Sequence, residues 1–437
     1  MGANAIRARG APESRLSIAF SLWDGGIPTT IDIARPLGCA IWRQRQFVTN
    51  PVTVWTAAQS SRQRTRGDHW QIAPGSRAAR LALSSAMVPN GQALGRDVRR
   101  RVFRNSDRMS ANRDREGVTA VKFLTADEIE RRLASRLGGI HAKQRLGIEA
   151  DHEAQAFGQG LNFLHLENMP ASQAIIEGVL RVSGMYWRGR ANAQQIQVRK
   201  NDVAAGLLPA AFEQFTILQL SDLHADMNLR AMDVVIRLVR ELRYDLCVLT
   251  GDYRGKTFGA FESCLATLRE LREVIKGDIY GVLGNHDSIR MVPDVEDMGM
   301  SMLLNEHVAI QRGDAKIYLA GIDDAHFYRV DNIEKAALGI PEEAFSILLS
   351  HTPEIYRQAA HAGFDLLLSG HTHGGQICLP GGVPIILEAE LPRSMGKGAW
   401  RYAKMAGYTS AGAGSSVVPV RFNCAPEITL HRLVIGI

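Results

Sequence analysis

Residues 364–376 read FDLLLSGHTHGGQ, an apolar run that ends in two histidines set among glycines. The run has the composition of a buried strand, and strand ends are where parallel sheets present reactive groups to a crevice. In extended backbone, residues i and i+2 face the same way, so His371 and His373 are expected to point at one object. Glycines beside them let the backbone approach a ligand closely. Two exposed loop histidines are the alternative, and the remainder of the chain decides between them.

The alternation of strand and helix continues on both sides of this stretch, from about residue 213 onward. Predicted strands are 215–221, 244–250, 278–284, 316–322, 345–350 and 364–370, and predicted helices are 231–242, 258–275 and a short one from Pro353. This pattern predicts an α/β domain of largely parallel order. Three later segments, 383–390, 406–411 and 427–437, are predicted to be further strands, running antiparallel.

Polar side chains directly follow five of these apolar strands. They are Asp222, His224, Asp252, Asn285, His286, Asp287, His351, His371 and His373. All of them except His286 and Asp287 are candidate metal ligands. These two Asp, one Asn and four His form a mixed ligand set that suits Mn, Fe or Zn better than Ca or a lone Mg. A single tetrahedral zinc needs about four ligands, so seven indicate two ions that share a carboxylate. Paired ions of this kind clamp the attacking and leaving oxygens of a phosphate group.

The order of these motifs resembles that of the calcineurin-like metallophosphoesterases. The matching segments are SDLH (221–224), TGD (250–252), GNHD (284–287), SHT (350–352) and GHTH (370–373), within roughly residues 213–435. The resemblance implies an α/β fold of two packed mixed β-sheets flanked by helices. It also implies a division of the ligands, in which one metal is held by Asp222, His224 and His373, the other by Asn285, His351 and His371, and both by Asp252.

Two longer segments, GHTHGGQICLPGG (370–382) and VPVRFNCAPEITLHRL (418–433), resemble a bacterial branch of that family. The branch includes UDP-2,3-diacylglucosamine pyrophosphatases of lipid A synthesis and membrane-associated phosphodiesterases. The resemblance implies hydrolysis of a phosphodiester or pyrophosphate by in-line attack of a hydroxide bridging two divalent ions, with Mn favoured over Fe or Zn. It further implies a phosphate-containing small molecule or nucleotide-lipid as substrate, and peripheral contact with the inner membrane.

Other functions remain open as alternatives. They are a cyclic-nucleotide or general phosphodiesterase, a phosphoprotein phosphatase and a non-catalytic metal-binding scaffold. His286 beside a complete ligand set argues against the scaffold. No specific nucleic-acid partner is expected, because the basic balance of the chain comes from its N-terminal quarter alone.

The residues around the ligands receive separate roles. His286 is expected to face away from its neighbour Asn285 and to protonate the leaving group as a general acid. Asp287 is expected to orient His286, with capping of the next helix as the alternative. His326, on a loop, is expected at the surface. Three cations follow ligand-bearing loops and are candidates for binding substrate phosphates, with exposed surface charges as the alternative: Arg254, Lys256 and Arg290.

Residues 1–115 differ from the body of the chain. They hold 19 arginines, no lysine and 7 acidic residues, a net charge of +12, whereas the other residues carry −6. This segment shows no helical or strand periodicity and is predicted to be a basic arm that is either disordered or an extension upstream of the true start, with an organelle transit segment as the third alternative. The absence of lysine beside 19 arginines favours the extension, in which case Met109 is the expected start.

A helical region is predicted for residues 123–200. Thr125 and Glu128 have the spacing of a capping box, and an apolar stripe runs through Ile129, Leu133 and Leu137 to a stop at the glycines 138–139. Residues 194–202 alternate like an edge strand. The metallophosphoesterase domain is predicted to occupy residues 213–437.

Five cysteines without a C-x-x-C pair favour reduced thiols, as in cytosolic proteins. No apolar window approaches the roughly 18 residues of a membrane span, and the N-terminus lacks the long apolar region of a secretory signal. The expected location is therefore the cytoplasm.

Overall fold

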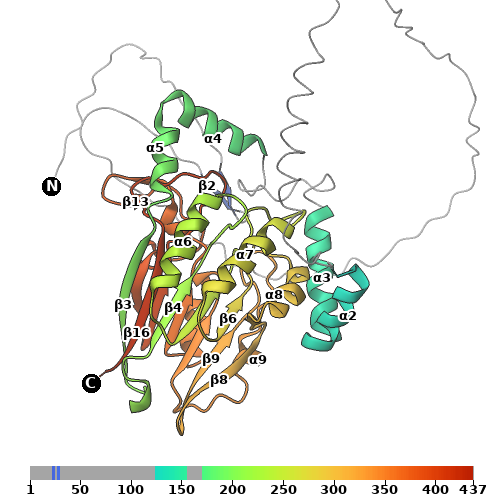
Figure 1. Ribbon diagram of the computed structural model, residues 1–437, viewed down its shortest axis with the longest axis vertical. Helices are drawn as coiled ribbons and strands as arrows, with labels where there is room; N and C mark the ends of the chain where they lie inside the picture. Colours follow the sequence, from blue (N-terminus) through green and yellow to red (C-terminus); the bar gives the residue numbers. More distant parts are fainter. Residues whose placement is uncertain (1–21, 25–26, 30–123, 155–169, 437) are drawn as a thin grey trace, which may run out of the picture. The chain divides into compact units, whose positions relative to one another are not determined.

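The computed structural model describes residues 22–24, 27–29, 124–154 and 170–436 (Figure 1). In the N-terminal quarter, β1 (Leu22–Asp24) and β2 (Ile27–Thr29) pair antiparallel, which the sequence analysis did not predict. Most of the arm predicted to be disordered lies outside the described residues. All other elements belong to a second unit, residues 105–437.

Two six-stranded sheets form this unit within the described part of the chain (Figure 1). The first has the order β3-β16-β4-β5-β6-β7, made of β3 (Gln197–Ala205), β16 (Glu427–Ile435), β4 (Thr216–Leu220), β5 (Leu246–Thr250), β6 (Ile279–Val282) and β7 (Ser301–Met302). The second has the order β14-β15-β11-β10-β9-β8, made of β14 (Gly398–Tyr402), β15 (Met405–Thr409), β11 (Leu366–Ser369), β10 (Ser346–Leu349), β9 (Ala315–Gly321) and β8 (Glu306–Arg312).

The central strands are apolar on both faces because each face meets a different layer. In β4, Ile217 belongs to the core between the two sheets, whereas Leu218 belongs to the core beneath the helices. In β11, Leu366 faces the other sheet and Leu367 faces outward to a third core. The predicted fold class, two packed mixed sheets flanked by helices, is therefore confirmed.

Helices cover the outer face of each sheet (Figure 1). The first sheet is covered by α6 (Leu229–Glu241) and α7 (Glu262–Val274), with α8 (Val292–Asp297) at the β7 edge. The second is covered by α9 (Ile333–Ala337) and α10 (Tyr356–His361).

The C-terminal strands depart from their predicted form. Of residues 383–390, Val383–Pro384 alone form a strand, β13, which pairs with β12 (Cys378–Leu379). The strand at 405–409 is antiparallel to β14 but parallel to β11, and β16 is antiparallel to β4 but parallel to β3. The expectation of purely antiparallel C-terminal strands is therefore wrong.

The helical N-terminal region contains α2 (Ala126–Leu137), α3 (Gly139–Ala154), α4 (Pro170–Val182) and α5 (Met185–Asn192). The predicted capping box of Thr125 and Glu128 is present, and the helix that it begins ends at Gly138. The predicted edge strand is β3. Among the described residues, no helix has the length and apolar character needed to cross a bilayer.

Candidate metal centre

The polar residues of the sequence motifs meet where the two sheets end together. Three of the loops follow β4, β5 and β6 of the first sheet, and two follow β10 and β11 of the second. Within each group the strands are parallel, so their carboxyl ends point the same way. The five strand ends thus belong to two sheets, and the site lies at an end that both sheets share.

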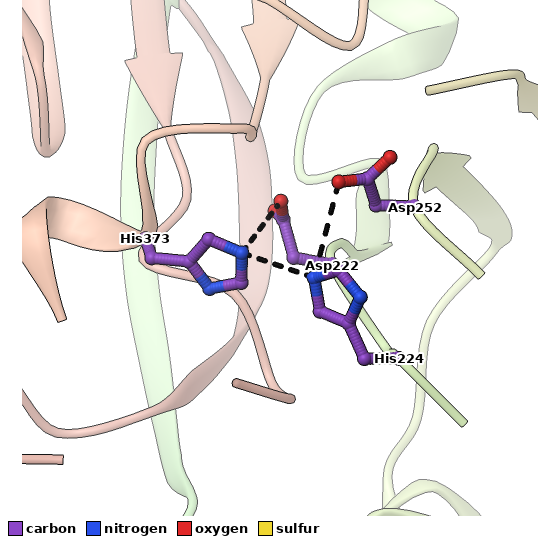
Figure 2. Close-up of side chains that lie close together, drawn as sticks. All are labelled: Asp222, His224, Asp252 and His373. Atoms are coloured by element: carbon purple, nitrogen blue, oxygen red, sulfur yellow. Dashed lines mark hydrogen bonds and ion pairs between the residues drawn. The ribbon is translucent and has the colours of Figure 1, made fainter. Parts of the chain in front are cut away.

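A first set of ligand atoms comes from Asp222, His224, Asp252 and His373 (Figure 2). The Nε2 atoms of His224 and His373 are 3.1 Å apart. Asp222 Oδ1 lies 3.5 Å from His373 Nε2, and Asp252 Oδ2 lies 3.8 Å from His224 Nε2. All four ligand atoms lie within 4.8 Å of one another, a spacing that one ion with four ligands can use.

A second set adjoins the first and shares Asp252 with it. It contains Asp252, His351 and His371, again with ligand atoms within 4.8 Å of one another. The Asn285 side-chain oxygen lies 2.9 Å from both His351 Nε2 and His371 Nδ1. The structure thus brings together all seven residues proposed as ligands, in the two groups that the family resemblance implied.

The donor chemistry of the second set fits a cation. His351 Nδ1 lies 2.8 Å from the Thr250 carbonyl oxygen and donates to it, which leaves a lone pair on Nε2. That lone pair faces two oxygen acceptors, Asn285 Oδ1 at 2.9 Å and Asp252 Oδ2 at 3.3 Å. Burial disfavours a charged His351, but the carboxylates of Asp252 and Asp222 together with the Thr250 carbonyl outweigh burial and raise the pKa of His351 to about 10. A divalent ion would satisfy the same three acceptors with the imidazole neutral.

Backbone strain is concentrated at the ligands. Five of the seven have left-handed φ angles: Asp222 (50°), His224 (40°), Asp252 (55°), His371 (70°) and His373 (50°). Each such residue costs about 1–3 kcal/mol, which the contacts around it must offset. His371 and His373 are therefore not in extended backbone, and they contribute to different sets, which corrects the expectation that both face one object.

Two glycines allow the loops to approach this closely. A Cβ on Gly370 would overlap the side chains of Ser221 and Asp222, and a Cβ on Gly284 would overlap Asp252. The glycines of the GNHD and GHTH motifs thus leave room for the carboxylates of neighbouring loops.

His286 lies beside the shared carboxylate. Its backbone N–H donates to Asp252 Oδ1 at 2.9 Å, and its Nε2 is 4.0 Å from Asp252 Oδ2. The ring is buried, with Nδ1 3.3 Å from the Thr257 hydroxyl. This places Nε2 next to both ligand sets, as a proton donor would require.

Asp287 does not orient His286 in the predicted way. Its Oδ2 accepts from the backbone N–H groups of Asp252 (2.7 Å) and Gly284 (2.9 Å), and its Oδ1 accepts from that of Tyr253 (2.9 Å). The cap of the next helical turn is Ser288, so the alternative role is also wrong. Asp287 instead joins the two loops that carry Asp252 and Asn285, and it acts as a positioning residue.

The three candidate cations differ in their surroundings. Arg254 is buried and donates to the backbone carbonyls of His286, Gly259 and Thr257, so its guanidinium holds the loop rather than a substrate. Arg290 lies 3.8 Å from Glu149 and 3.9 Å from Glu153, which act as its counter-ions. Lys256 is exposed. A phosphate-binding role is thus disfavoured for Arg254 and Arg290.

Two residues of the site were missed or misjudged from the sequence. His326 is not a surface histidine, because its ring centroid is 4.3 Å from that of His371 and its Nδ1 is 2.7 Å from Glu354 Oε2. Arg421, fully buried, donates to the His373 carbonyl oxygen at 2.9 Å and lies 3.1 Å from His373 Nδ1. Neither follows a strand that the sequence marks as a ligand carrier, so position along the chain gave no signal.

Helix α3 also reaches the site from outside the motifs. Arg145 is buried and donates to the Asp287 carbonyl oxygen at 3.1 Å and to Glu149 at 3.1 Å. Glu149 in turn accepts from the Ser288 hydroxyl and from the Ile289 backbone N–H. The loop after His286 is therefore fixed by a helix that precedes the catalytic domain in sequence.

Comparison with known proteins adds to this geometry. The family model for calcineurin-like phosphoesterases matches residues 215–375. Two Bacillus subtilis proteins, the uncharacterized metallophosphoesterases YkoQ and YkuE, are each 30% identical to the chain, over 56% and 60% of it, and the match covers 93% of each relative. Phosphodiesterase YaeI of Escherichia coli is 28% identical over 50% of the chain and 82% of its own length.

Proposed function

Because this chain belongs to the calcineurin-like phosphoesterase family, we propose that it is a two-metal hydrolase of phosphodiester or pyrophosphate bonds. The hydrolysis of phosphate esters is the activity that defines the family. The observation that carries the more specific proposal is the pair of buried ligand sets that share Asp252.

Each proposed metal has its own ligands. One would be held by Asp222, His224, His373 and Asp252, and the other by Asp252, Asn285, His351 and His371. When bound, two divalent ions lower the pKa of coordinated water and offset the negative charge of a phosphate. We propose manganese for both positions, with iron or zinc as alternatives.

His286 is proposed to donate the proton that the leaving oxygen needs. Proton donation by a positioned imidazole contributes typically 10²–10⁴-fold to rate. Two neighbours fix this imidazole, because Arg254 donates to the His286 carbonyl oxygen and the Thr257 hydroxyl lies beside Nδ1. Both contacts leave Nε2 on the side of Asp252.

The substrate proposed first is a nucleotide-lipid pyrophosphate of the UDP-2,3-diacylglucosamine type, on the basis of the segments 370–382 and 418–433. Such a substrate would reach the chain from a membrane surface, so peripheral membrane contact by a cytoplasmic protein is part of this proposal. A cyclic-nucleotide or general phosphodiesterase is the second candidate, and the similarity to a phosphodiesterase favours it.

An activity screen tests the proposal. The protein, loaded with Mn²⁺, Fe²⁺ or Zn²⁺, is assayed on UDP-2,3-diacylglucosamine, cyclic nucleotides, bis-p-nitrophenyl phosphate and a phosphopeptide. Hydrolysis of a diester or pyrophosphate that disappears in the Asp252→Asn variant supports the proposal. Turnover of the phosphopeptide alone would contradict it.

A further inference from the structure

A cavity of about 340 Å³ opens directly beside the metal-ligand sets. Its inner end is formed by His371, Thr372 and His373, and the other walls are largely aliphatic. The aliphatic residues are Ile176, Ile377, Ile385, Ile386, Val417 and Val418. Any molecule that fills this space therefore lies against two of the proposed metal ligands.

The walls come from distant parts of the sequence, and the side chain of Gln376 joins two of them, at residues 375–377 and 416–418. Gln376 Oε1 accepts from the Ser416 backbone N–H at 2.9 Å, and its Nε2 donates to the carbonyl oxygens of Ser416 (2.8 Å) and Val418 (3.0 Å). Val417 is held at a φ of 58°, which is rare for a β-branched residue and costs free energy. A strained valine fixed by three hydrogen bonds indicates a built surface rather than a gap between loops.

The charge of the cavity limits what it can bind. Glu388 is the one charged side chain among its lining residues, and none of them is cationic. A nucleotide or a second phosphate would lose its hydration there without gaining a counter-ion. An aliphatic chain would lose no hydrogen bonds and would gain contacts with the aliphatic walls.

Aliphatic side chains continue outward from the cavity. Ile385 and Ile386 are 53% and 55% exposed. Helix α4, whose Ile176 forms one wall, also carries Ile175 at 65% exposure, and Ile176 and Val417 belong to the same apolar cluster. The surface that leads from solvent to the ligand sets on this side is thus largely aliphatic, with Glu388 as its charged member among the described residues.

We propose that this cavity is a subsite for an aliphatic chain carried by the phosphate compound that the enzyme hydrolyses. The inference rests on the proposed function and adds to it the place where an amphiphilic phosphoester would bind the alkyl or acyl group that lies close to its scissile phosphate. A chain in the cavity would place that phosphate against His371 and His373.

A homologous series of substrates tests the subsite. Methyl, butyl and octyl p-nitrophenyl phosphate share one leaving group and differ in the alkyl chain alone, and they are compared below their micelle-forming concentrations. Burial of each added methylene predicts about a two- to fourfold rise in kcat/KM, expressed mainly through KM. The Ile386→Asp and Ile176→Asp variants are expected to lower the octyl-to-methyl ratio at least tenfold.

The control is Leu338→Asp, which makes the same kind of change at a side chain that is 76% exposed and is not part of the cavity. It should leave the ratio as in the wild type. A wild-type enzyme that hydrolyses the methyl ester but shows no dependence on chain length would overturn the subsite and leave the proposed function standing.

A binding measurement separates the subsite from turnover. Octylphosphonate and methylphosphonate, which are not hydrolysed, are titrated into the metal-loaded protein by calorimetry. At least tenfold tighter binding of the octyl compound, lost in Ile386→Asp, supports the subsite even if no ester is turned over. Equal affinities for the two phosphonates would overturn it.

Discussion

Asp252 is the residue on which both ligand sets depend, because one carboxylate contributes to each. Its backbone N–H is held by Asp287 and its Oδ1 accepts from the His286 N–H, so Oδ2 remains for the histidines of both sets. The loss of this side chain should therefore affect two ions rather than one.

The metal content of an Asp252→Ala variant tests this dependence. Wild-type protein should hold about two transition-metal ions per chain by elemental analysis, and the variant should hold fewer than one. Asp233→Asn, on the exposed face of α6, is the control and should keep both ions. At most one ion in wild-type protein after Mn²⁺ loading would contradict the shared site.

His286→Ala should separate metal binding from chemistry. The imidazole is not in either ligand set, so the variant should retain both ions. Turnover of substrates with poor leaving groups, such as alkoxides, should fall about 10²–10⁴-fold, whereas p-nitrophenyl esters should suffer less because p-nitrophenolate needs little protonation. Equal losses on both kinds of substrate would exclude the general-acid role.

At the scale of residues, the positions of the ligands could be predicted from the sequence, but the residues that hold the ligand loops in place could not. Each ligand comes shortly after an apolar strand, so a reading of strand ends was sufficient to find Asp222 or His351. Asp287 and Arg254 act on backbone groups of other loops, and those partners exist only in the folded chain. His326 and Arg421 come close to His371 and His373 from loops that follow no ligand-bearing strand, and the resemblance of segment 418–433 gave Arg421 no role.

Among the elements, α3 has a larger role than its sequence indicated. Arg145 lies over the Tyr328 ring at 3.4 Å and contacts two buried carboxylates, Glu149 and Asp323. Arg145 also donates to the Asp287 carbonyl oxygen, and this bond connects the N-terminal helical region to the loop of His286 and Asp287.

The Arg145→Met variant should be less stable by about 3–5 kcal/mol, because it removes the fully buried cation that pairs with two buried carboxylates, Glu149 and Asp323. Its kcat should also fall, since the loop of His286 loses a support. Urea denaturation and steady-state kinetics measure the two effects. Arg131→Met, at an exposed position of α2, is the control. If Arg145→Met has the same free energy of unfolding as Arg131→Met, this role for α3 is refuted.

Strand β16 contains a histidine that should make stability depend on pH. His431 is fully buried, donates from Nε2 to Gln219 Oε1 at 2.9 Å and accepts from Asn201 Nδ2 at 3.0 Å. Burial lowers the pKa of His431 to about 3, so the folded state keeps it neutral while the unfolded chain binds a proton below about pH 6.5. The contribution of His431 to the free energy of unfolding is therefore fully present above about pH 6.5, and it is lost as the pH falls towards 3.

The expected slope is about 1.4 kcal/mol per pH unit between roughly pH 6 and pH 4. His431→Gln lacks this titration, so the difference in unfolding free energy between wild type and variant should narrow as the pH falls. Urea denaturation in EDTA, which removes metal effects, measures the difference. A difference that stays constant over this pH range would contradict a neutral buried His431.

Predictions of elements succeeded where a strand is buried on both faces. β4, β5, β10 and β11 are continuous apolar runs, and each lies within its predicted range. β8 was missed because its residues are half-exposed and give no apolar run. Residues 385–386 have a strand-like composition but are more than half exposed. Their apolar side chains line the cavity and are not part of a sheet.

For the whole molecule, every site residue and every buried core residue that the structure describes in the second unit lies at or beyond residue 133. A chain that starts at Met109 should therefore fold, bind two ions and hydrolyse substrate with an unchanged kcat/KM. Its melting temperature should lie within about 5 °C of that of the full-length chain, a limit that corresponds to about 1–2 kcal/mol for a domain of this size. A larger drop, or a large loss of activity, would show that residues 1–108 support the domain.

The division of the ligands between two sheets has a consequence for the protein inside a cell. Four ligands come from loops of the first sheet and three from loops of the second, so a bound ion would act as a cross-link between the halves of the sandwich. Binding to the folded state alone adds about 2.7 kcal/mol of stability at a free ion concentration of 100 times Kd. During metal starvation that contribution disappears, the unfolded fraction rises, and proteases would remove the chain faster. The abundance of the enzyme would then follow the supply of its metal, without any change in transcription.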